Sequence, residues 1–415
     1  MDVTVLGAGR EVGRSAILVN TGAEKFLLDY GIEVQNMNTP LAPPLDLAAT
    51  FPSHAHLDHC GLVPMLRRNG HAGDVFATPA TLDIMDLMLR DSIKVQEKRG
   101  VEPYFASKDI DRSLSQAVRC RFGKSIQFKN TAVSVHNAGH VPGSASILLD
   151  TGRKRMVYTG DIKFSETELM EPAYSNFKDI DAVITESTYW YRNHPDRKAL
   201  EKWLVDVVKS THDNNGFSVL PCFAVGRTQE MLLIVSRLGI PVYLDGMGRD
   251  VTRIILQHPD SVRNTKRLKQ AFSAARKITS PNHRKKALQE PGIIITTAGM
   301  LNGGPVHYYI KKLHDRENSS LILTGYQVEN TVGRMLMETG KYVTEELSVK
   351  PRMGVTFMDF SAHCSRDELL EFFRKTSPEK IILVHSPTTH EFAEELKNMG
   401  FQAYAPANGD AVSIG

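Results

Sequence analysis

The feature that most constrains this chain is a dense cluster of metal-ligating side chains at His54-Ala55-His56-Leu57-Asp58-His59. Four side chains that can bind a metal fall within six residues, directly after the apolar segment Leu47–Phe51 and before the apolar run Leu62–Leu66. Zinc in proteins prefers imidazole nitrogen and carboxylate oxygen as ligands. A loop this short cannot wrap all four groups around one ion, but it can offer a pair to each of two neighbouring ions. The loop therefore predicts a two-metal site at the end of a strand.

The same arrangement recurs along the chain, because several short apolar segments are each followed by a residue that can bind a metal. The segments are Thr131–Val135, Met156–Tyr158, Ala182–Thr185, Gly354–Met358 and Lys380–Val384, and the residues that follow them are His140, Asp161, Glu186, His363 and His385. Strand ends lie at the rim of a sheet, where the loops that follow can converge on one point. The series therefore predicts one site built from both ends of the chain.

The middle of the chain, residues 189–350, has a different pattern, in which apolar strands alternate with helices. The expected strands are Ser218–Phe223, Val242–Leu244, Gly292–Thr297 and Leu321–Thr324, and the expected helices include Arg227–Leu238 and Gly248–Gln257. Such alternation predicts a parallel, doubly wound sheet. The sequence of this region contains no cluster of metal ligands. We therefore predict an α/β domain at 189–350, inserted into a catalytic domain made of residues 1–188 and 351–415.

The start of the chain predicts a β-meander, with strands at Val3–Leu6, Ser15–Val19 and Lys25–Leu28. The glycine pattern from Gly7 to Gly13 imitates a dinucleotide-binding loop, and Asp29 lies where a ribose-binding acid would. A dinucleotide loop must open a helix, whereas the segment that follows here is rich in β-formers. The pattern therefore argues against nucleotide binding.

These motifs resemble the metallo-β-lactamase superfamily, whose dinuclear site combines such a histidine loop with a later histidine and a bridging aspartate. His140, within Ala138–Ser144, matches the later histidine, and Asp161 matches the bridging aspartate. Asp29 matches the carboxylate that braces the histidine loop, and bracing is expected because ligand imidazoles need their other N–H oriented. The resemblance implies a four-layer αββα fold with two Zn²⁺ ions per chain. The ligands that it implies are His54, His56 and His140 for one ion, Asp58, His59 and His385 for the other, and Asp161 for both.

The chain is similar, more narrowly, to the β-CASP nucleases within that superfamily. Three of their motifs are matched by Glu186 in Thr185–Tyr189, His363 in Phe360–His363 and His385 in Leu383–His385, and the inserted region is matched at Phe223–Glu230, Ala298–Pro305 and Gly325–Asn330. The resemblance points to the endonuclease subunit of the cleavage and polyadenylation specificity factor and its archaeal relatives, with RNase J more distant. It implies a ribonuclease, since the members that act on RNA carry histidine in the third motif.

The resemblance also implies catalytic roles for Asp58, Asp161, Glu186 and His363. Two neighbouring metal ions can clamp a phosphate and provide hydroxide for in-line attack at neutral pH. His363 is the candidate to stabilise the scissile phosphate or to protonate the leaving 3′ oxygen, and Glu186 would orient a neighbouring histidine. One departure concerns the residues after His385, where Pro387 restricts Ser386 to extended conformations. The sequence therefore leaves open how His385 approaches the metal.

Single-stranded RNA is the expected partner, although the net charge of +3 is too small to identify a nucleic-acid ligand by itself. From Val262 to Lys286 the chain carries nine Lys/Arg and no Asp/Glu, which fits either a solvated helix face or a surface that follows phosphates. Beside a phosphodiesterase site the second interpretation is favoured. The expected RNA-binding residues are Arg227, Lys266, Arg267, Arg284, Lys285, Gly303 and Gly304. The glycines would let backbone amides approach phosphate, or else form a tight turn.

The composition, with 41% apolar and 23% charged residues, is that of a globular protein. No apolar run approaches the ~18–20 residues that span a bilayer, and four scattered cysteines fit a reducing cytoplasm. Two alternatives remain: a small-molecule metallo-hydrolase of the thioesterase or lactamase type, and a non-catalytic RNA-binding subunit. The family resemblance also allows a homodimer or an RNA-processing complex. Endonucleolytic and 5′–3′ exonucleolytic attack are not distinguished by these residues.

Overall fold

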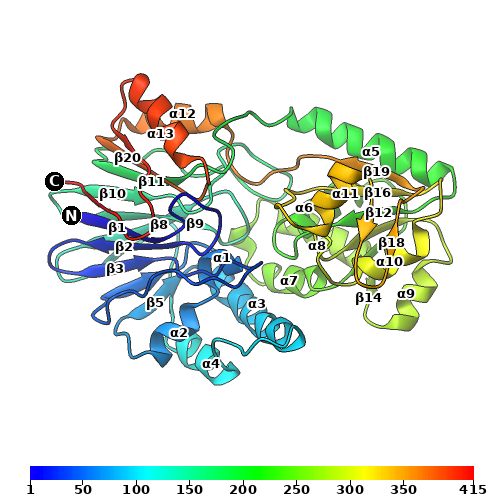
Figure 1. Ribbon diagram of the computed structural model, residues 1–415, viewed down its shortest axis with the longest axis horizontal. Coiled ribbons are helices and arrows are strands. Elements are labelled where there is room, and N and C mark those ends of the chain that lie inside the picture. Colours follow the sequence, from blue (N-terminus) through cyan, green and yellow to red (C-terminus); the bar gives the residue numbers. More distant parts are fainter. The chain divides into compact units, whose positions relative to one another are not determined.

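The computed structural model describes residues 1–415, and the chain forms two compact units (Figure 1). The first unit consists of Met1–Glu166, Glu171–Asn193 and His363–Gly415. The second consists of Thr167–Met170 and His194–Ala362. The first unit is therefore assembled from both ends of the chain, and most of the second is a continuous insertion.

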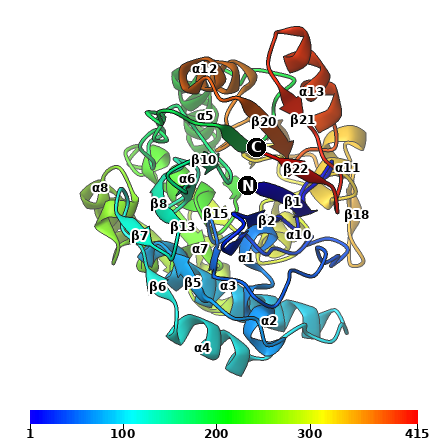
Figure 2. The same ribbon diagram turned by 90° about the vertical axis from the view of Figure 1, so that its left-hand side faces the viewer.

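The first unit contains two seven-stranded sheets. The order in the first sheet is β22 (Ala411–Ser413), β1 (Asp2–Gly7), β2 (Ala16–Asn20), β3 (Lys25–Leu28), β4 (Ala49–Phe51), β5 (Asp74–Ala77) and β6 (Val118–Arg119). The order in the second is β21 (Ala403–Tyr404), β20 (Lys380–Val384), β11 (Ala182–Glu186), β10 (Arg155–Tyr158), β9 (Ala145–Asp150), β8 (Ala132–Asn137) and β7 (Ser125–Gln127). The first and last strands are neighbours, since β1 pairs antiparallel with β22, and Figure 2 shows both termini at this place.

The core of the first unit lies between its two sheets. One cluster joins Val3, Val5 and Ile17 of the first sheet to Val133 and Ile147 of the second. Successive residues of a strand point to opposite faces, so the second sheet has a further apolar face to cover. On β20, Ile382 belongs to the core between the sheets, whereas Ile381 and Leu383 belong to the cluster on the other face.

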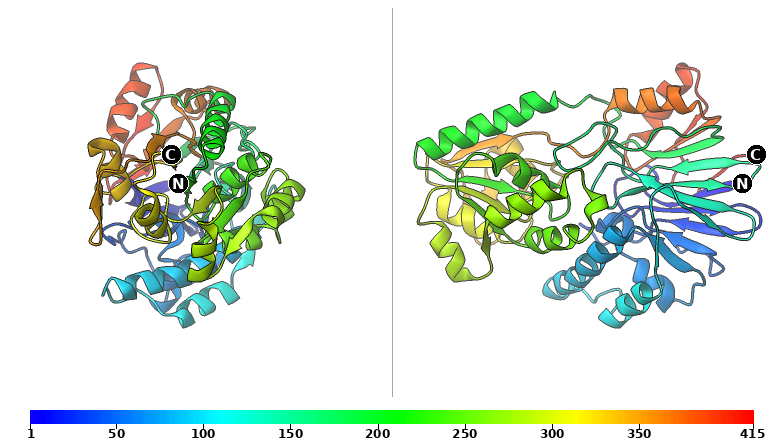
Figure 3. Two further views of the ribbon diagram at one scale, coloured as in Figure 1. Left: turned by 90° about the vertical axis from the view of Figure 1, so that its right-hand side faces the viewer. Right: turned by 180° about the vertical axis from the view of Figure 1, so that it is seen from behind.

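Helices cover the outer faces of both sheets, which gives the αββα order of layers. Helices α12 (Arg366–Thr376) and α13 (Thr389–Asn398) pack on the second sheet through buried side chains such as Phe373 and Phe392. On the side of the first sheet lie α1 (Leu57–Cys60), α2 (Val63–Arg68), α3 (Pro79–Lys98) and α4 (Ser107–Ser115), as Figure 3 shows from behind. Helix α3 starts after Thr78, whose hydroxyl accepts a hydrogen bond from the amide of Thr81, and Pro79 occupies its first turn.

The second unit has a six-stranded, all-parallel sheet. Its order is β14 (Arg276–Ile278), β13 (Val242–Asp245), β15 (Ile293–Thr296), β12 (Ser218–Pro221), β16 (Ser320–Leu323) and β19 (Gly354–Phe357). Its helices are α5 (Arg197–Asp213), α6 (Arg227–Val235), α7 (Gly248–Ile255), α8 (Thr265–Ala274), α9 (Pro281–Ala287), α10 (Val306–Leu313) and α11 (Val332–Thr339), with a 3₁₀ turn η1 (Pro259–Ser261) and a hairpin of β17 (Tyr342–Val343) and β18 (Ser348–Val349). The strand β15 is buried along its length and has three successive isoleucines, as expected for a parallel sheet buried on both faces.

The predicted fold class, an αββα domain with an inserted doubly wound α/β domain, is confirmed. The position of one strand differs from the prediction. We expected Gly354–Met358 to belong to the catalytic domain, but β19 pairs in parallel with β16 of the inserted sheet, with Ser320 opposite Gly354. The second unit consequently extends to Ala362. The apolar pattern of so short a strand predicts a strand but says nothing about its neighbour.

The meander at the start of the chain is also confirmed, since β1, β2 and β3 pair antiparallel in sequence order. The segment after the glycine pattern is β2 and not a helix, which agrees with the argument against a dinucleotide site. Among all the helices described, none is both long enough and apolar enough to cross a lipid bilayer.

Candidate metal centre

The histidine loop lies directly after β4 and is braced by the buried Asp29, which follows β3. The Oδ1 atom of Asp29 accepts a hydrogen bond from the amide of Ser53 at 2.5 Å. Its Oδ2 atom accepts from Nδ1 of His59 at 2.7 Å and from the hydroxyl of Tyr158 at 2.6 Å. With Nδ1–H of His59 held in this way, the lone pair of Nε2 is directed to the opposite side of the ring. Asp29 therefore lies where the sequence placed the bracing carboxylate.

One group of candidate ligands consists of His54, His56, His140 and Asp161, whose ligating atoms lie within 4.8 Å of one another. His54 and His56 come from the histidine loop, His140 from the loop after β8, and Asp161 from the loop after β10. The Nε2 atoms of His54 and His140 are each 3.6 Å from Oδ2 of Asp161. The structure thus brings together the residues that the sequence assigned to the first ion.

A second group consists of Asp58, His59 and His385. The Oδ2 atom of Asp58 is 3.4 Å from Nε2 of His385 and 3.8 Å from Nε2 of His59. His385 follows β20 with a left-handed backbone (φ 61°), and its amide donates to the carbonyl of Ala8 at 2.8 Å. The proline two residues later therefore does not keep the side chain of His385 away from the site.

Asp161 belongs to the first group and also lies beside two members of the second, His59 and His385. Its Oδ2 atom is 3.3 Å from Nε2 of His59, and its Oδ1 atom is 3.7 Å from Nδ1 of His385. Asp161 is only 3% exposed, so water does not screen its charge. The two groups consequently adjoin one another across this single carboxylate.

The polar atoms at the centre have the chemistry that a metal ion would satisfy. Four of them are buried without a hydrogen-bond partner, namely Nε2 of His56, Nε2 of His59, Nε2 of His385 and Oδ1 of Asp161. A buried polar atom without a partner costs about 1–3 kcal/mol, so four in one small volume require a compensating ligand. Imidazole nitrogen and carboxylate oxygen together suit zinc. The donors present therefore fit a metal centre.

The pKa values of His54, His56 and Asp58 suit metal binding. Burial lowers the pKa of His54 well below its usual value, and the neighbouring His59 lowers it further. Burial likewise lowers the pKa of His56. Burial acts to raise the pKa of Asp58, but His59 and His385 outweigh it and hold the pKa below its usual range. Neutral imidazole and ionised carboxylate are the forms that bind metal. Burial acts to lower the pKa of His59, but the charges of Asp161, Asp29 and Asp58 outweigh it and raise the pKa well above its usual value, so His59 would give up a proton on binding a metal ion.

Beside the two groups lies a carboxylate–histidine pair, Glu186 and His363. Nδ1 of His363 is 2.9 and 2.8 Å from the two carboxylate oxygens of Glu186, and Oε1 also accepts from the amide of Ile162 at 2.9 Å. The ring centroids of His363 and His140 are 4.7 Å apart. Burial acts to lower the pKa of His363, but the charges of Glu186 and Asp161 outweigh it and raise the pKa to about 9. These two carboxylates therefore favour the protonated form of His363.

Helix α12 starts three residues after His363, and Glu368 fixes its start. The carboxylate of Glu368 accepts a hydrogen bond from the amide of Ser365 at 2.8 Å and pairs with the buried ammonium of Lys163 at 3.1 Å. Neither Glu368 nor Lys163 was predicted from the sequence. The acid three residues after Ser365 is a capping-box signal that could have located this helix start.

The expected RNA-binding residues lie in the second unit and are not gathered on one helix face. The basic stretch is divided among α8, β14 and α9. Arg267 is paired with Glu168 at 2.7 Å, and Arg284 is paired with Asp245 at 2.7 Å, whereas Lys266 and Lys285 are exposed. The interpretation as a helix face in solvent therefore fits part of the stretch.

Gly303 and Gly304, the two glycines among the expected RNA-binding residues, differ in their surroundings. At Gly304, which has a φ of 78°, a Cβ would lie 2.7 Å from the carbonyl oxygen of Thr297, so this position requires glycine for a tight turn. At Gly303 a Cβ would meet nothing within 4 Å. The structure accordingly favours the tight-turn interpretation for Gly304.

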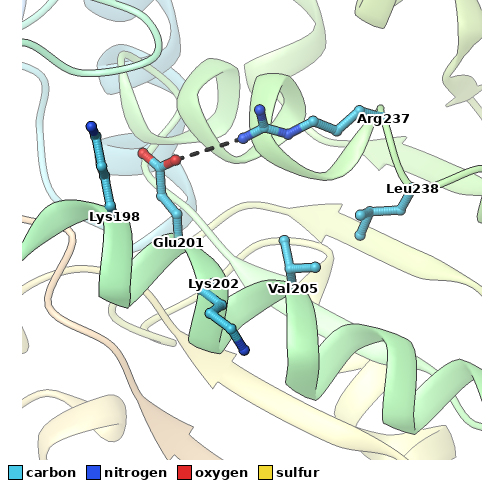
Figure 4. A pocket seen from close by; sticks show the side chains of 6 residues that line it. All are labelled: Lys198, Glu201, Lys202, Val205, Arg237 and Leu238. Carbon is cyan, nitrogen blue, oxygen red and sulfur yellow. Dashed lines mark ion pairs between the residues drawn. The ribbon is translucent and has the colours of Figure 1, made fainter.

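The second unit has a surface pocket that contains none of the candidate metal ligands. Its lining residues, drawn in Figure 4, are Lys198, Glu201, Lys202, Val205, Arg237 and Leu238. Arg237 is paired there with Glu201 at 3.6 Å. None of the predicted site residues contributes to this pocket.

Comparison with protein families finds three matching domain models. Residues 16–213 match a beta-lactamase superfamily domain, residues 228–336 match a Beta-Casp domain, and residues 348–406 match a Zn-dependent metallo-hydrolase RNA specificity domain. The matches therefore fall on parts of both units and include the histidine loop, His140, Asp161 and His385.

Three curated relatives are each 35% identical to the chain. The probable RNase MJ4 of Methanocaldococcus jannaschii aligns over the full length of both proteins. The RNase aCSPSF2 of Saccharolobus solfataricus aligns with 99% of this chain and 85% of its own length. The transcription termination factor FttA of M. jannaschii aligns with 99% of this chain and 71% of its own length.

A solved structure has the same fold at low sequence identity. A protein of unknown function from Enterococcus faecalis V583 superimposes with a TM-score of 0.63 and 14% identity, over 99% of each chain. At this identity the likeness concerns the fold alone.

Proposed function

Because the chain belongs to the β-CASP family of metallo-β-lactamase-fold hydrolases, we propose that it is a zinc-dependent ribonuclease. The proposed reaction is hydrolysis of phosphodiester bonds in single-stranded RNA with two metal ions. His54, His56 and His140 would hold one ion, and Asp58, His59 and His385 the other. Asp161, which adjoins both groups, would serve both ions.

The observation that carries the proposal is the position of Asp161 between two complete ligand groups, with His363 and Glu186 beside them. A single metal ion would leave one of these groups of buried polar atoms without a partner. When bound, a pair of zinc ions neutralises phosphate charge and makes hydroxide available at neutral pH.

The residues of the chain would contribute orientation and a proton. Asp29 fixes the ring of His59 through Nδ1, so that its Nε2 faces Asp58 and Asp161. Glu186 binds Nδ1 of His363 in the same way, and we expect the opposite nitrogen of that ring, Nε2, to meet the substrate. Protonated there, His363 can donate to the leaving 3′ oxygen or bind a phosphate oxygen.

RNA is proposed as the substrate on two grounds. The match of residues 348–406 is to an RNA specificity domain, and two of the relatives bear the name RNase. His385, which lies in the second ligand group, is the histidine expected at the third motif of RNA-directed members. The ligands are buried, so a single strand can approach them where a duplex would be too wide.

The test is cleavage of a 5′-labelled single-stranded RNA by the wild-type protein, with and without added zinc, beside Asp161→Ala. We expect zinc-dependent internal products that fall by more than about 100-fold in the variant, since even residues that only orient ligands cost 10- to 100-fold. Asp46→Ala removes an exposed carboxylate of the same unit and is the matched control.

The products of this assay also separate the alternatives. Release of labelled mononucleotide alone would indicate a 5′–3′ exonuclease at the same site. Binding of RNA without any metal-dependent cleavage would support a non-catalytic RNA-binding subunit. Turnover of a thioester or lactam in place of RNA would contradict the ribonuclease proposal.

A further inference from the structure

Arg227 is a buried cation that forms no ion pair. It is the first residue of α6 in the second unit and is only 9% exposed. Its Nε atom is buried without a hydrogen-bond partner. The nearby Arg197, in contrast, forms ion pairs with both Glu201 and Glu230. A buried charge is normally paired and hydrogen-bonded, so Arg227 lacks what a purely structural arginine has.

The acidic groups closest to Arg227 are already engaged. Glu230 accepts hydrogen bonds from the amides of Glu168 at 3.0 Å and Leu169 at 2.8 Å, in addition to its pair with Arg197. Asp359 lies 3.4 Å from Nδ1 of His194. Neither carboxylate forms an ion pair with Arg227, although the charges of both act on it.

The electrostatic surroundings of Arg227 also favour an anion. Burial and the positive charge of Arg197 lower the pKa of Arg227 to about 10, although Glu230 acts in the opposite direction. Arg227 is also the first residue of α6, at the positive end of the helix dipole. The first amides of α6 are occupied, since Thr228 donates to the carbonyl of Phe223 and Gly226 donates to Gln229. An anion here would consequently be bound by the guanidinium itself.

We propose that Arg227 binds a phosphate group of the RNA substrate. The inference rests on the proposed ribonuclease function, because RNA is the anionic substrate of that function. A guanidinium matches a phosphate with two parallel hydrogen bonds, which a lysine ammonium cannot reproduce. The phosphate could be an internal phosphodiester or a 5′-terminal phosphate, which share this chemistry.

The first test measures binding of single-stranded RNA by the full-length chain in an Asp161→Ala background, which prevents cleavage. Arg227→Gln is expected to weaken binding by about 10- to 100-fold and Arg227→Lys by less, since a hydrogen bond to a charged group contributes this much. The slope of log affinity against log salt should fall by about 0.7 in Arg227→Gln. Arg352→Gln removes an equal charge from the exposed ion pair with Glu317 in the same unit, outside the basic stretch, and should leave the affinity unchanged.

RNAs with a 5′-phosphate and with a 5′-hydroxyl distinguish the two sources of phosphate. An equal loss of affinity for both RNAs supports an internal phosphodiester, and a loss confined to the 5′-phosphorylated RNA supports a terminal phosphate. Unchanged affinity of Arg227→Gln for both RNAs overturns the proposal.

A second measurement is thermal unfolding of the metal-loaded protein, here with Asp161 unchanged. If Arg227 serves a ligand, Arg227→Gln should unfold at the same temperature as the wild type or above it, because an unpaired buried charge is removed. Inorganic phosphate should raise the unfolding temperature of the wild type more than that of Arg227→Gln. If Arg227→Gln does not fold, the RNA affinity of Arg227→Lys tests the proposal instead. An affinity equal to that of the wild type in this variant overturns the proposal.

The two readouts separate this inference from the ribonuclease proposal. Phosphate stabilisation that depends on Arg227, in a protein that cleaves no RNA, would support the anion site and contradict the ribonuclease. RNA cleavage with unchanged phosphate stabilisation and unchanged RNA affinity in Arg227→Gln would do the reverse.

Discussion

The candidate metal centre of the first unit and the basic stretch of the second hold their charged side chains in opposite ways. In the first, Asp29 and Glu186 are buried and each fixes one nitrogen of a histidine. In the second, Lys266 and Lys285 of the basic stretch are exposed. Reacting groups must be held to within a fraction of an ångström, which requires burial and bracing. Attraction of a flexible polyanion tolerates mobile cations in solvent, and Arg227 is the exception that the second unit contains.

Removal of the metal with a chelator should have the largest effect, and it tests the difference between the metal centre and the second unit. RNA cleavage should be abolished and then restored by zinc. Amide hydrogen exchange should accelerate in the histidine loop, because its buried nitrogens lose their partner, while β12 and β15 of the second unit exchange as before. Mass spectrometry of exchanged peptides measures this, and a uniform acceleration in both units would contradict it.

His363→Ala is expected to reduce kcat for RNA cleavage by about 10²- to 10⁴-fold, the usual contribution of a positioned acid or base. The metal content should stay that of the wild type, since His363 is assigned to neither ligand group. Rapid-quench kinetics and elemental analysis of the purified protein measure the two quantities. His390→Ala, at an exposed position of the same unit, is the control. Loss of metal together with activity would make His363 a ligand.

Asp29→Asn should weaken metal binding by about 10- to 100-fold, because the ring of His59 loses its carboxylate partner. The amide retains an oxygen that can accept from Ser53, so the variant tests the charge of Asp29 more than the shape of the loop. Competition with a fluorescent zinc chelator measures the affinity. An affinity equal to that of the wild type would mean that bracing by Asp29 is not needed for metal binding.

Lys266→Ala and Lys285→Ala should have the smallest effects. Each should raise KM for RNA by less than about fivefold, since an exposed charge contributes about 1 kcal/mol or less. The effect should vanish at high salt, where exposed charges are screened. Steady-state kinetics at two salt concentrations measure this. A change as large as that expected for Arg227→Gln would erase the distinction between exposed and buried cations in the second unit.

The candidate metal ligands could be predicted from the sequence because each stands in a local pattern. His54 to His59 follow one strand, and His140, Asp161 and His385 each follow another. A strand end is a local property, so apolar segments and the residues after them were sufficient to nominate the set. The residues that contact each ligand could not be predicted in the same way. The hydroxyl of Tyr158, which donates to Asp29, was not predicted, since only the pairing of distant strands brings the two together.

The sequence by itself determined the ligand types, the two kinds of domain and the alternation of strands and helices, because these depend on residues close to one another in the chain. Only the tertiary structure decided that β19 joins the inserted sheet, that the buried Lys163 pairs with Glu368 and that Arg227 is buried without an ion-pair partner. Each of these depends on pairing, on distances of a few ångströms or on exclusion of water, and residues far apart in the chain set all three.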